Sequence, residues 1–207
     1  MSSLEKYGPQ AEHWTEGEYA DPARYLHHRA ELIARLGLPL EHGDTVLDLA
    51  CGDGGLAAPL RALGLRYLGV DAAPAMVEAA RTRGIDAVLG DLNDYRPPEP
   101  VAATTVFRAV YYARDRLVFF RHVEEFTERK LVFDLNPRQY RLEDVRADLR
   151  AAGFDRLDLR PFFTPQRVAL PRLPSALLAA AERISPLAHL ALRYRFTYLC
   201  AAYRSAP

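Results

Sequence analysis

The sequence has few cysteines and lysines, no excess of charge and no long apolar run. Two cysteines among 207 residues predict no disulfide framework, so a reducing, cytoplasmic location is expected. Basic and acidic residues number 27 each, and without a basic excess we do not expect nucleic acid as a partner. Lysine occurs only as Lys6 and Lys130, an arginine bias typical of a GC-rich genome. No apolar run reaches the roughly 20 residues of a membrane span, so no transmembrane segment is expected.

Metal-binding patterns are also missing, whereas core-forming residues are plentiful. The six histidines are scattered, and the adjacent His27 and His28 would point apart on a helix, so no metal site is predicted. Hydrophobic residues make up 49% of the chain, which is ample for a core. At this length we expect a single domain over residues 1–207.

The chain is organised around residues 45–60, TVLDLACGDGGLAAPL. A β-rich apolar run ends at Leu49, a glycine-rich turn follows, and an Ala/Leu-rich helical pattern begins. Strand, glycine turn and helix form the opening of a βαβ unit. The glycines allow a ligand to approach the backbone, and Asp48 lies at the carboxyl end of the strand, where open parallel sheets bind ligands. A carboxylate there suits a cationic group.

Strand and helix patterns alternate along most of the chain, which predicts an α/β fold with a doubly wound, mostly parallel sheet and helices on both faces. Asp21 and Pro22 predict the start of a helix that Gly37 ends. Later helices are predicted up to about residue 63 and over 75–83, 115–127 and 142–152. The predicted strands are 46–49, 66–71, 86–91, 101–107, 130–135, 157–162 and 195–203.

Two segments do not follow this alternation of strands and helices. Residues 1–40 form an N-terminal helical cap, in which residues 1–20 are irregular but carry aromatic side chains that we expect to pack over something. Residues 163–193 form a helical insertion between the last two strands. The stretch 176–192 is apolar nearly all round and is interrupted by charge and proline. It either packs on the sheet edge or a second copy of the chain, or forms a lid over an apolar, lipid-like acceptor.

Three acids, Asp48, Asp71 and Asp91, end three successive predicted strands. Parallel strands of a doubly wound sheet bring these ends side by side. An acid after the second strand suits ribose hydroxyls, one after the third can accept from an adenine amine, and one after the first suits an ammonium group. The three acids together describe a site for adenosine linked to an amino acid.

The segments VLDLACGDGGLAAPL, LGVDAAPAMVEAAR and VLGDLNDY resemble the successive motifs of class I S-adenosylmethionine-dependent methyltransferases of the small-molecule type. The resemblance runs from about residue 7 to 203. It implies a Rossmann-like seven-stranded sheet whose last strand is antiparallel and lies beside the sixth. Three positions depart from the pattern. Ala50 replaces the first motif glycine, Ala73 replaces a helix-capping serine, and Pro100 and Val101 stand where an acid often begins the fourth strand.

The resemblance also implies roles for individual residues. Asp48 and the turn Ala50, Cys51 and Gly52 face the methionine part of S-adenosylmethionine, and Asp71 takes the ribose hydroxyls. The remaining implied contacts are Ala72 and Met76 beside the adenine, Asp91 and Leu92 at its edge, Arg108 on the far side of the cofactor, and Tyr7 covering the methionine end.

The acceptor is harder to read, because in-line displacement at a sulfonium rests mainly on positioning and electrostatics. We expect a small, apolar or lipid-like acceptor, and Tyr112 is the favoured catalytic residue. The other acceptor-side candidates are His28, Arg108, Asn136 and Tyr194. A monomer, a homodimer and a brief membrane contact stay open.

Two other functions are left open. The chain could be a catalytically silent S-adenosylmethionine-binding partner protein. It could also be an NAD(P)-binding Rossmann oxidoreductase, since Gly52, Gly55 and Asp71 partly match that fingerprint. The oxidoreductase pattern, however, needs a glycine at Ala50 and would leave Asp91 without a role.

Overall fold

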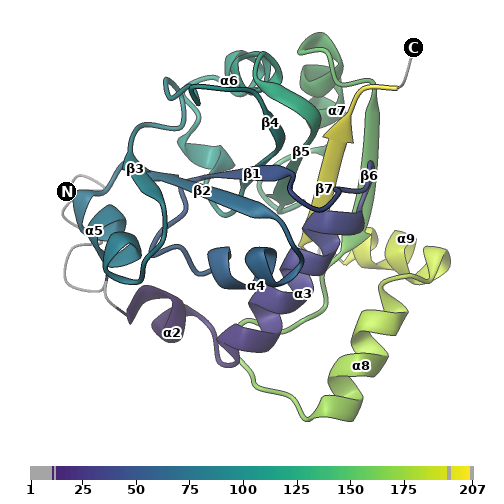
Figure 1. Cartoon of the computed structure of the whole chain (residues 1–207). Helices are drawn as coiled ribbons and strands as arrows, with labels where there is room; N and C mark the ends of the chain where they lie inside the picture. The colour runs from purple at the N-terminus through teal and green to yellow at the C-terminus, as the bar shows by residue number, and fades with distance from the viewer. Residues whose placement is uncertain (1–10, 12, 195–196, 206–207) are drawn as a thin grey trace.

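The computed structural model describes residues 11, 13–194 and 197–205 (Figure 1). A seven-stranded sheet runs through it in the order β3-β2-β1-β4-β5-β7-β6. Neighbouring strands from β3 to β5 are parallel, whereas β7 is antiparallel to both β5 and β6. The strands are β1 (Thr45–Leu49), β2 (Arg66–Asp71), β3 (Ala87–Leu89), β4 (Val101–Val106), β5 (Thr127–Leu135), β6 (Arg156–Pro161) and β7 (Tyr198–Tyr203). The predicted sheet, with its antiparallel last strand beside the sixth, is confirmed.

Helices cover both faces of the sheet (Figure 1). The described helices are α2 (Trp14–Glu18), α3 (Pro22–Arg35), α4 (Ala57–Ala62), α5 (Pro74–Thr82), α6 (Arg116–Glu124), α7 (Leu142–Ala151), α8 (Arg172–Ala181) and α9 (Ser185–Arg193), with a short 3-10 turn η2 (Val110–Tyr112). Successive residues of β1 point to opposite faces. Val46 packs with α3 and α4, whereas Leu47 and Leu49 pack with α6 and α7. Burial on both faces explains the continuous apolar run of this central strand.

Helix α3 begins and ends through polar contacts. The Asp21 carboxylate accepts a hydrogen bond from the Arg24 backbone N–H at 3.1 Å, and Pro22 occupies the first turn, as predicted. At the other end, the buried Nζ of Lys130 donates to the Leu36 carbonyl at 2.7 Å. This contact joins the C-terminus of α3 to strand β5.

Two elements differ most from the prediction, and β3 is also shorter than the predicted 86–91, since it ends at Leu89 and Asp91 follows it. Helix α6 ends at Glu124, and β5 already begins at Thr127, where the helix was expected to continue. The local sequence is polar enough for a helix, but Thr127 pairs with Val101, and its hydroxyl lies 2.6 Å from that of Thr104 on β4. Cross-strand pairing therefore overrides the local pattern. The second difference is α2, a helix within a segment predicted to be irregular.

The insertion contains two helices, α8 and α9, where one interrupted stretch was expected. Both lie outside the sheet, and α9 lies beside β6, with Ala191 buried in the core (Figure 1). Two contacts tie α8 and its C-cap residue to α3: Arg24 Nη1 donates to Ser175 Oγ at 2.8 Å, and His28 Nε2 lies 2.7 Å from Glu182 Oε2. No helix of the described residues is long and apolar enough to cross a membrane. Strand β7 begins at Tyr198; residues 195 and 196 of the predicted strand lie outside the described residues.

Candidate functional site

The carboxyl ends of β1, β2 and β3 meet at one edge of the sheet, where a cavity of about 310 Å³ opens. Its lining includes all three strand-end acids. Every described cofactor-side residue of the sequence prediction lines this cavity, namely Asp48, Ala50, Cys51, Gly52, Asp71, Ala72, Met76, Asp91, Leu92 and Arg108. Tyr7 lies outside the described residues. The spacing of the motifs therefore predicts which side chains come together.

The turn after β1 carries two residues in the left-handed region, Ala50 and Gly52, each with φ near 59°. This region is costly for alanine and nearly free for glycine. The Gly52 N–H donates to Asp71 Oδ2 at 2.8 Å, which ties the turn to the end of β2. A Cβ added at Gly52 would lie 3.3 Å from Trp14 Cδ1, so the indole of α2 packs closely over this turn.

Asp48 is almost completely buried, with 3% of its surface exposed. Its carboxylate accepts hydrogen bonds from the Tyr67 hydroxyl at 2.9 Å and from Thr105 Oγ1 at 2.7 Å. Burial raises the pKa of Asp48 from 3.8 to about 6, although the two hydrogen bonds oppose the shift. A bound cation would favour the ionised form.

Asp71 and Asp91 differ in their surroundings. Asp71 accepts from the Gly52 and Ala73 N–H groups through different oxygens, at 2.8 and 2.9 Å, which leaves lone pairs on each for a ligand. Burial raises the pKa of Asp71, against these backbone hydrogen bonds. Partial burial disfavours ionisation of Asp91 too, but hydrogen bonds from Asn93 and the charge of Arg114 together hold its pKa below the ordinary value. Both oxygens of Asp71 can accept further hydrogen bonds from hydroxyl groups.

Arg29 of α3 is a lining residue that the sequence prediction missed. Its guanidinium is buried, with 3% of the residue exposed, and lies over the rings of Tyr25, Phe107 and Phe162 at 4.7, 4.4 and 5.6 Å. Nη2 donates to the Tyr25 hydroxyl at 2.7 Å, and Nε has no hydrogen-bond partner. A buried cation with an unsatisfied donor beside a cavity favours an anionic ligand. The sequence does hold a signal that could have identified Arg29. It is a charged residue on the apolar stripe of α3, three residues after Leu26 and four before Ile33.

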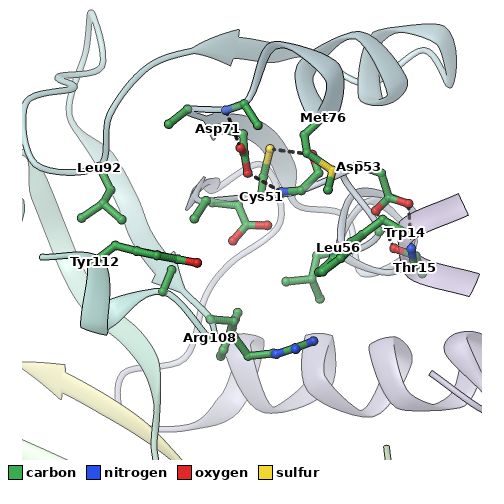
Figure 2. A pocket seen from close by; sticks show the side chains of 18 of the residues that line it. Trp14, Thr15, Cys51, Asp53, Leu56, Asp71, Met76, Leu92, Arg108 and Tyr112 are labelled. Atoms are coloured by element: carbon green, nitrogen blue, oxygen red, sulfur yellow. Dashed lines mark hydrogen bonds between the residues drawn. The ribbon is translucent and has the colours of Figure 1, made fainter. Parts of the chain in front are cut away.

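Asp53 was also missed; it lines the first cavity, and its contacts hold the cavity wall. Its buried carboxylate accepts from the Thr15 N–H at 2.9 Å, from Thr15 Oγ1 at 2.5 Å and from Arg83 Nη1 at 2.8 Å. These contacts hold α2 against the glycine turn, and they place Trp14 and Thr15 in the cavity wall (Figure 2). The aromatic residues of the N-terminal segment do pack over the chain, as expected for Trp14 and Tyr19.

The opposite side of the cavity carries Leu92 and Tyr112, and the Tyr112 hydroxyl points into the space between the two walls (Figure 2). Arg108 closes a third side, and its backbone has φ 54° in the left-handed region. The Arg108 N–H donates to Asp134 Oδ1 at 2.7 Å, and Nη1 donates to Glu18 Oε2 at 2.7 Å. These two contacts hold a strained backbone position at the cavity rim.

A second cavity of about 380 Å³ adjoins the first and shares three residues with it, Arg108, Ala109 and Tyr111. Its further lining is largely polar and includes Asn136, one of the acceptor-side candidates. The other lining residues are Tyr25, Val110, Asp134, Gln139, Tyr140, Phe162, Thr164, Gln166 and Thr197.

Two acceptor-side candidates lie elsewhere. His28 contacts Glu182, and Tyr194 is 67% exposed and lines neither cavity. Among the described residues, no group of three or more histidine, cysteine or acidic residues could hold a metal ion.

Sheet order, an antiparallel seventh strand and an acid-lined cavity at the carboxyl edge together define the fold of class I S-adenosylmethionine-dependent methyltransferases. The predicted resemblance to that class is confirmed. Residues 46–129, from β1 into β5, match the family model described as a methyltransferase domain.

Solved structures share the fold over nearly the whole chain. A chain in the complex formed by the Haloferax volcanii Trm112 methyltransferase activator aligns with a TM-score of 0.67, at 22% identity, over 100% of this chain and 99% of that one. Magnesium protoporphyrin IX methyltransferase from Synechocystis PCC 6803, solved with bound S-adenosylmethionine, aligns with a TM-score of 0.60, at 16% identity, over 99% and 86%. At these identities the likeness establishes the fold.

Sequence relatives match a shorter stretch. Trans-aconitate 2-methyltransferase of Mycobacterium tuberculosis (strain ATCC 25177 / H37Ra) is 46% identical over 72 residues, which make up 32% of this chain and 26% of the relative. The match therefore spans about a quarter of the length of that curated relative, and the acceptor cannot be transferred from it.

Proposed function

We propose that this chain is an S-adenosylmethionine-dependent methyltransferase acting on a small molecule. The observation that carries the proposal is the gathering of three strand-end acids, from β1, β2 and β3, in one cavity at the carboxyl edge of the sheet. Bound there, S-adenosylmethionine would supply an electrophilic methyl group on its sulfonium.

The lining residues fit the chemistry of this cofactor. Asp48 would bind the ammonium group, Asp71 the ribose hydroxyls and Asp91 the adenine edge. The buried guanidinium of Arg29, with its unsatisfied Nε, would pair with the carboxylate of the methionine part. Ala72, Met76 and Leu92 supply apolar contact for the adenine. The sequence motifs assign Cys51 and Gly52 to the methionine part of the cofactor. Arg29 is a further contact to the same part.

Within the same proposal, the acceptor enters through the second cavity and meets the cofactor beside Arg108 and Tyr111, which line both cavities. The sequence favoured an apolar or lipid-like acceptor under a lid formed by the insertion. The amide, hydroxyl and carboxylate groups around the second cavity instead support an acceptor with polar groups at its reacting end. The described residues of α8 and α9 line neither cavity, so the support for a lid rests on the sequence pattern.

The role of this chain in the reaction is to position the acceptor in line with the methyl–sulfur bond. Asp48 and Arg29 would fix the methionine part, and the wall formed by Trp14 and Thr15 excludes water from one side. Tyr112 would orient the acceptor through its hydroxyl, which points into the first cavity.

Calorimetry with S-adenosylmethionine, S-adenosylhomocysteine and NAD tests the cofactor. Binding of both sulfur ligands and not of NAD is expected; tight NAD binding without a response to the others would contradict the proposal. Transfer of labelled methyl to small-molecule fractions of a lysate then separates an enzyme from a silent cofactor-binding partner.

Replacing Tyr112 with phenylalanine tests its positioning role. We expect an unchanged affinity for S-adenosylhomocysteine and a rate of methyl transfer about 10-fold lower, the effect of one lost hydrogen bond of about 1 kcal/mol or slightly more. Tyr194→Phe, at a 67% exposed tyrosine that lines neither cavity, is the matched control. An equal loss in both variants would show that the effect does not arise from the Tyr112 hydroxyl in the cavity.

A further inference from the structure

The insertion exposes apolar side chains that a surface helix ordinarily turns inward. On α8, Leu173 is 72% exposed and Leu177 64% exposed, and they stand one turn apart. Among the described residues, seven of the eleven large hydrophobic side chains that are exposed belong to residues 168–194. We call the set Leu173, Leu177, Ile184, Leu187 and Leu190 the leucine surface. Helix α8 has no buried residue, so its exposed leucines do not belong to a face that packs on the core.

The exposed charges on the described residues of α8, α9 and the turn between them have one sign. Arg172, Arg183 and Arg193 are exposed within the same segment. Its acidic residue, Glu182, is 2% exposed and contacts His28 Nε2 and the Phe163 N–H. In a chain with zero net charge, this segment therefore presents exposed leucines together with exposed positive charge.

This combination disfavours a second copy of the chain as the occupant. A symmetric dimer places the same patch of both subunits in contact, so the arginines of one copy would face those of the other. A partner surface that accepts leucines and carries negative charge fits better. Apolar side chains flanked by arginine on short helices are the pattern of segments that lie in the plane of an anionic membrane surface.

We infer that the leucine surface of α8 and α9 docks on an anionic lipid bilayer, with the leucines among the acyl chains and the arginines at the headgroups. The contacts of α8 with α3, through Ser175 and Glu182, remain on the protein side. The same insertion begins at the second cavity, which Thr164 and Gln166 line. Docking would therefore bring the entrance used by the acceptor close to the membrane. The docking itself does not depend on the proposed methyl transfer.

Flotation of the whole chain with vesicles tests this inference. Vesicles of phosphatidylcholine alone are compared with vesicles that also contain phosphatidylglycerol, at low and high salt. Binding to the anionic vesicles that weakens with salt is expected. Arg172→Gln and Arg183→Gln should each weaken it about fivefold, from about 1 kcal/mol per arginine at the surface. Arg141→Gln, whose side chain is 77% exposed on another loop, should leave it unchanged.

The apolar part is tested by the double variant Leu173→Ser and Leu177→Ser. We expect binding to anionic vesicles to fall roughly tenfold or more, because two leucine side chains that would be partly buried in the bilayer are lost. Val118→Ser, at a 61% exposed valine on α6, is the matched control. Circular dichroism and the midpoint of thermal unfolding verify that each variant is folded.

Three results would overturn the inference. The first is a folded chain that floats with neither kind of vesicle. The second is equal binding to neutral and anionic vesicles, which would remove the role of the arginines. The third is a dimer in solution that the double leucine variant converts to a monomer, which would assign the surface to a second copy.

Discussion

At the scale of single residues, Asp48 and Arg29 of the first cavity each have an unfavourable feature in the free protein. Asp48 lies in a buried position that opposes its ionisation, and Arg29 has an unsatisfied donor among aromatic rings. Each is a cost to the free protein that a ligand of opposite charge relieves. Because such groups gain most when a ligand binds, they are sensitive points at which to test the site.

The ionisation of Asp48 predicts how cofactor affinity depends on pH. Its folded-state pKa of about 6 lies above the 3.8 of an ordinary aspartate. Between these values the folded state binds more protons than the unfolded state, so the contribution of Asp48 to stability falls as pH rises from about 4 to 6. An ammonium ligand needs the ionised form. Affinity for S-adenosylmethionine should therefore increase as pH rises through about 6.

The variant Asp48→Asn should abolish that dependence and lower the affinity at neutral pH by about 1.5–3 kcal/mol, the size of a charged hydrogen bond. Asparagine keeps one acceptor oxygen for one of the two hydroxyls, and its amide N–H can donate to the other, so the turn should keep its shape. Calorimetry over a series of pH values gives the measurement. A pH dependence that persists in the variant would show that another group controls binding.

Arg29→Met should weaken binding of S-adenosylmethionine but not of its decarboxylated analogue, because only the former carries a carboxylate. We expect the wild-type protein to prefer S-adenosylmethionine by roughly tenfold or more and the variant to bind both alike. Arg35→Met, at an exposed position on the same helix, is the control. If the preference is unchanged in a folded Arg29→Met protein, the carboxylate binds elsewhere.

At the scale of elements, α2 forms a wall of the cavity because Asp53, which lies 38 residues after Thr15, holds it. The variant Asp53→Ala removes the acceptor of three hydrogen bonds and leaves α2 held by its remaining contacts, such as that of Arg108 with Glu18. Cofactor affinity should fall by about 1.5–3 kcal/mol, because the wall formed by Trp14 and Thr15 loosens. Asp94→Ala, at a 64% exposed acid, serves as control. Trp14 fluorescence should change in the first variant only; an unchanged signal with normal affinity would mean that α2 is held by other contacts.

Helix α8 should exchange its amide hydrogens faster than β1. Its residues are not buried, whereas Val46, Leu47 and Leu49 are fully buried. Hydrogen exchange of the free chain, read by mass spectrometry, measures both segments. Protection of residues 172–181 equal to that of the central strand would show that α8 is a fixed structural element, and the predicted lid would then be abandoned.

The local sequence was sufficient to predict a strand where the end of the strand coincides with turn residues. Residues 66–71 form β2 as predicted, because a β-rich run is followed directly by Asp71 and a proline-initiated helix. The start of β5 could not be predicted, because polar residues such as Thr127 become strand only through pairing with β4. Helix α2 depends on a carboxylate far along the chain. The role of Arg29 can be recognised only once the fold brings three aromatic rings around it, Tyr25 from α3 and the residues that follow β4 and β6, Phe107 and Phe162.

At the scale of the whole molecule, the strand order distinguishes between the two protein classes whose motifs the glycine turn matches, methyltransferases and NAD(P)-binding oxidoreductases. A nicotinamide-binding sheet has six parallel strands in the order 3-2-1-4-5-6. Here β7 lies between β5 and β6 and runs antiparallel to both. The alternative of an NAD(P)-binding oxidoreductase therefore does not fit the fold, and the fragmentary match at Gly52 and Gly55 is explained by a turn common to both classes.

The position of β7 also determines when the sheet can be completed during synthesis. Strand β6 joins the sheet through β7, which pairs with β5 on its other side. While the ribosome still holds residues 198–203, strand β5 has a free hydrogen-bonding edge and β6 has no neighbour to pair with. The insertion must be synthesised in between, which lengthens this interval by the time needed for α8 and α9. An unpaired edge on a nascent chain is a site for aggregation. The nascent protein should therefore depend on chaperones between the synthesis of β5 and that of β7.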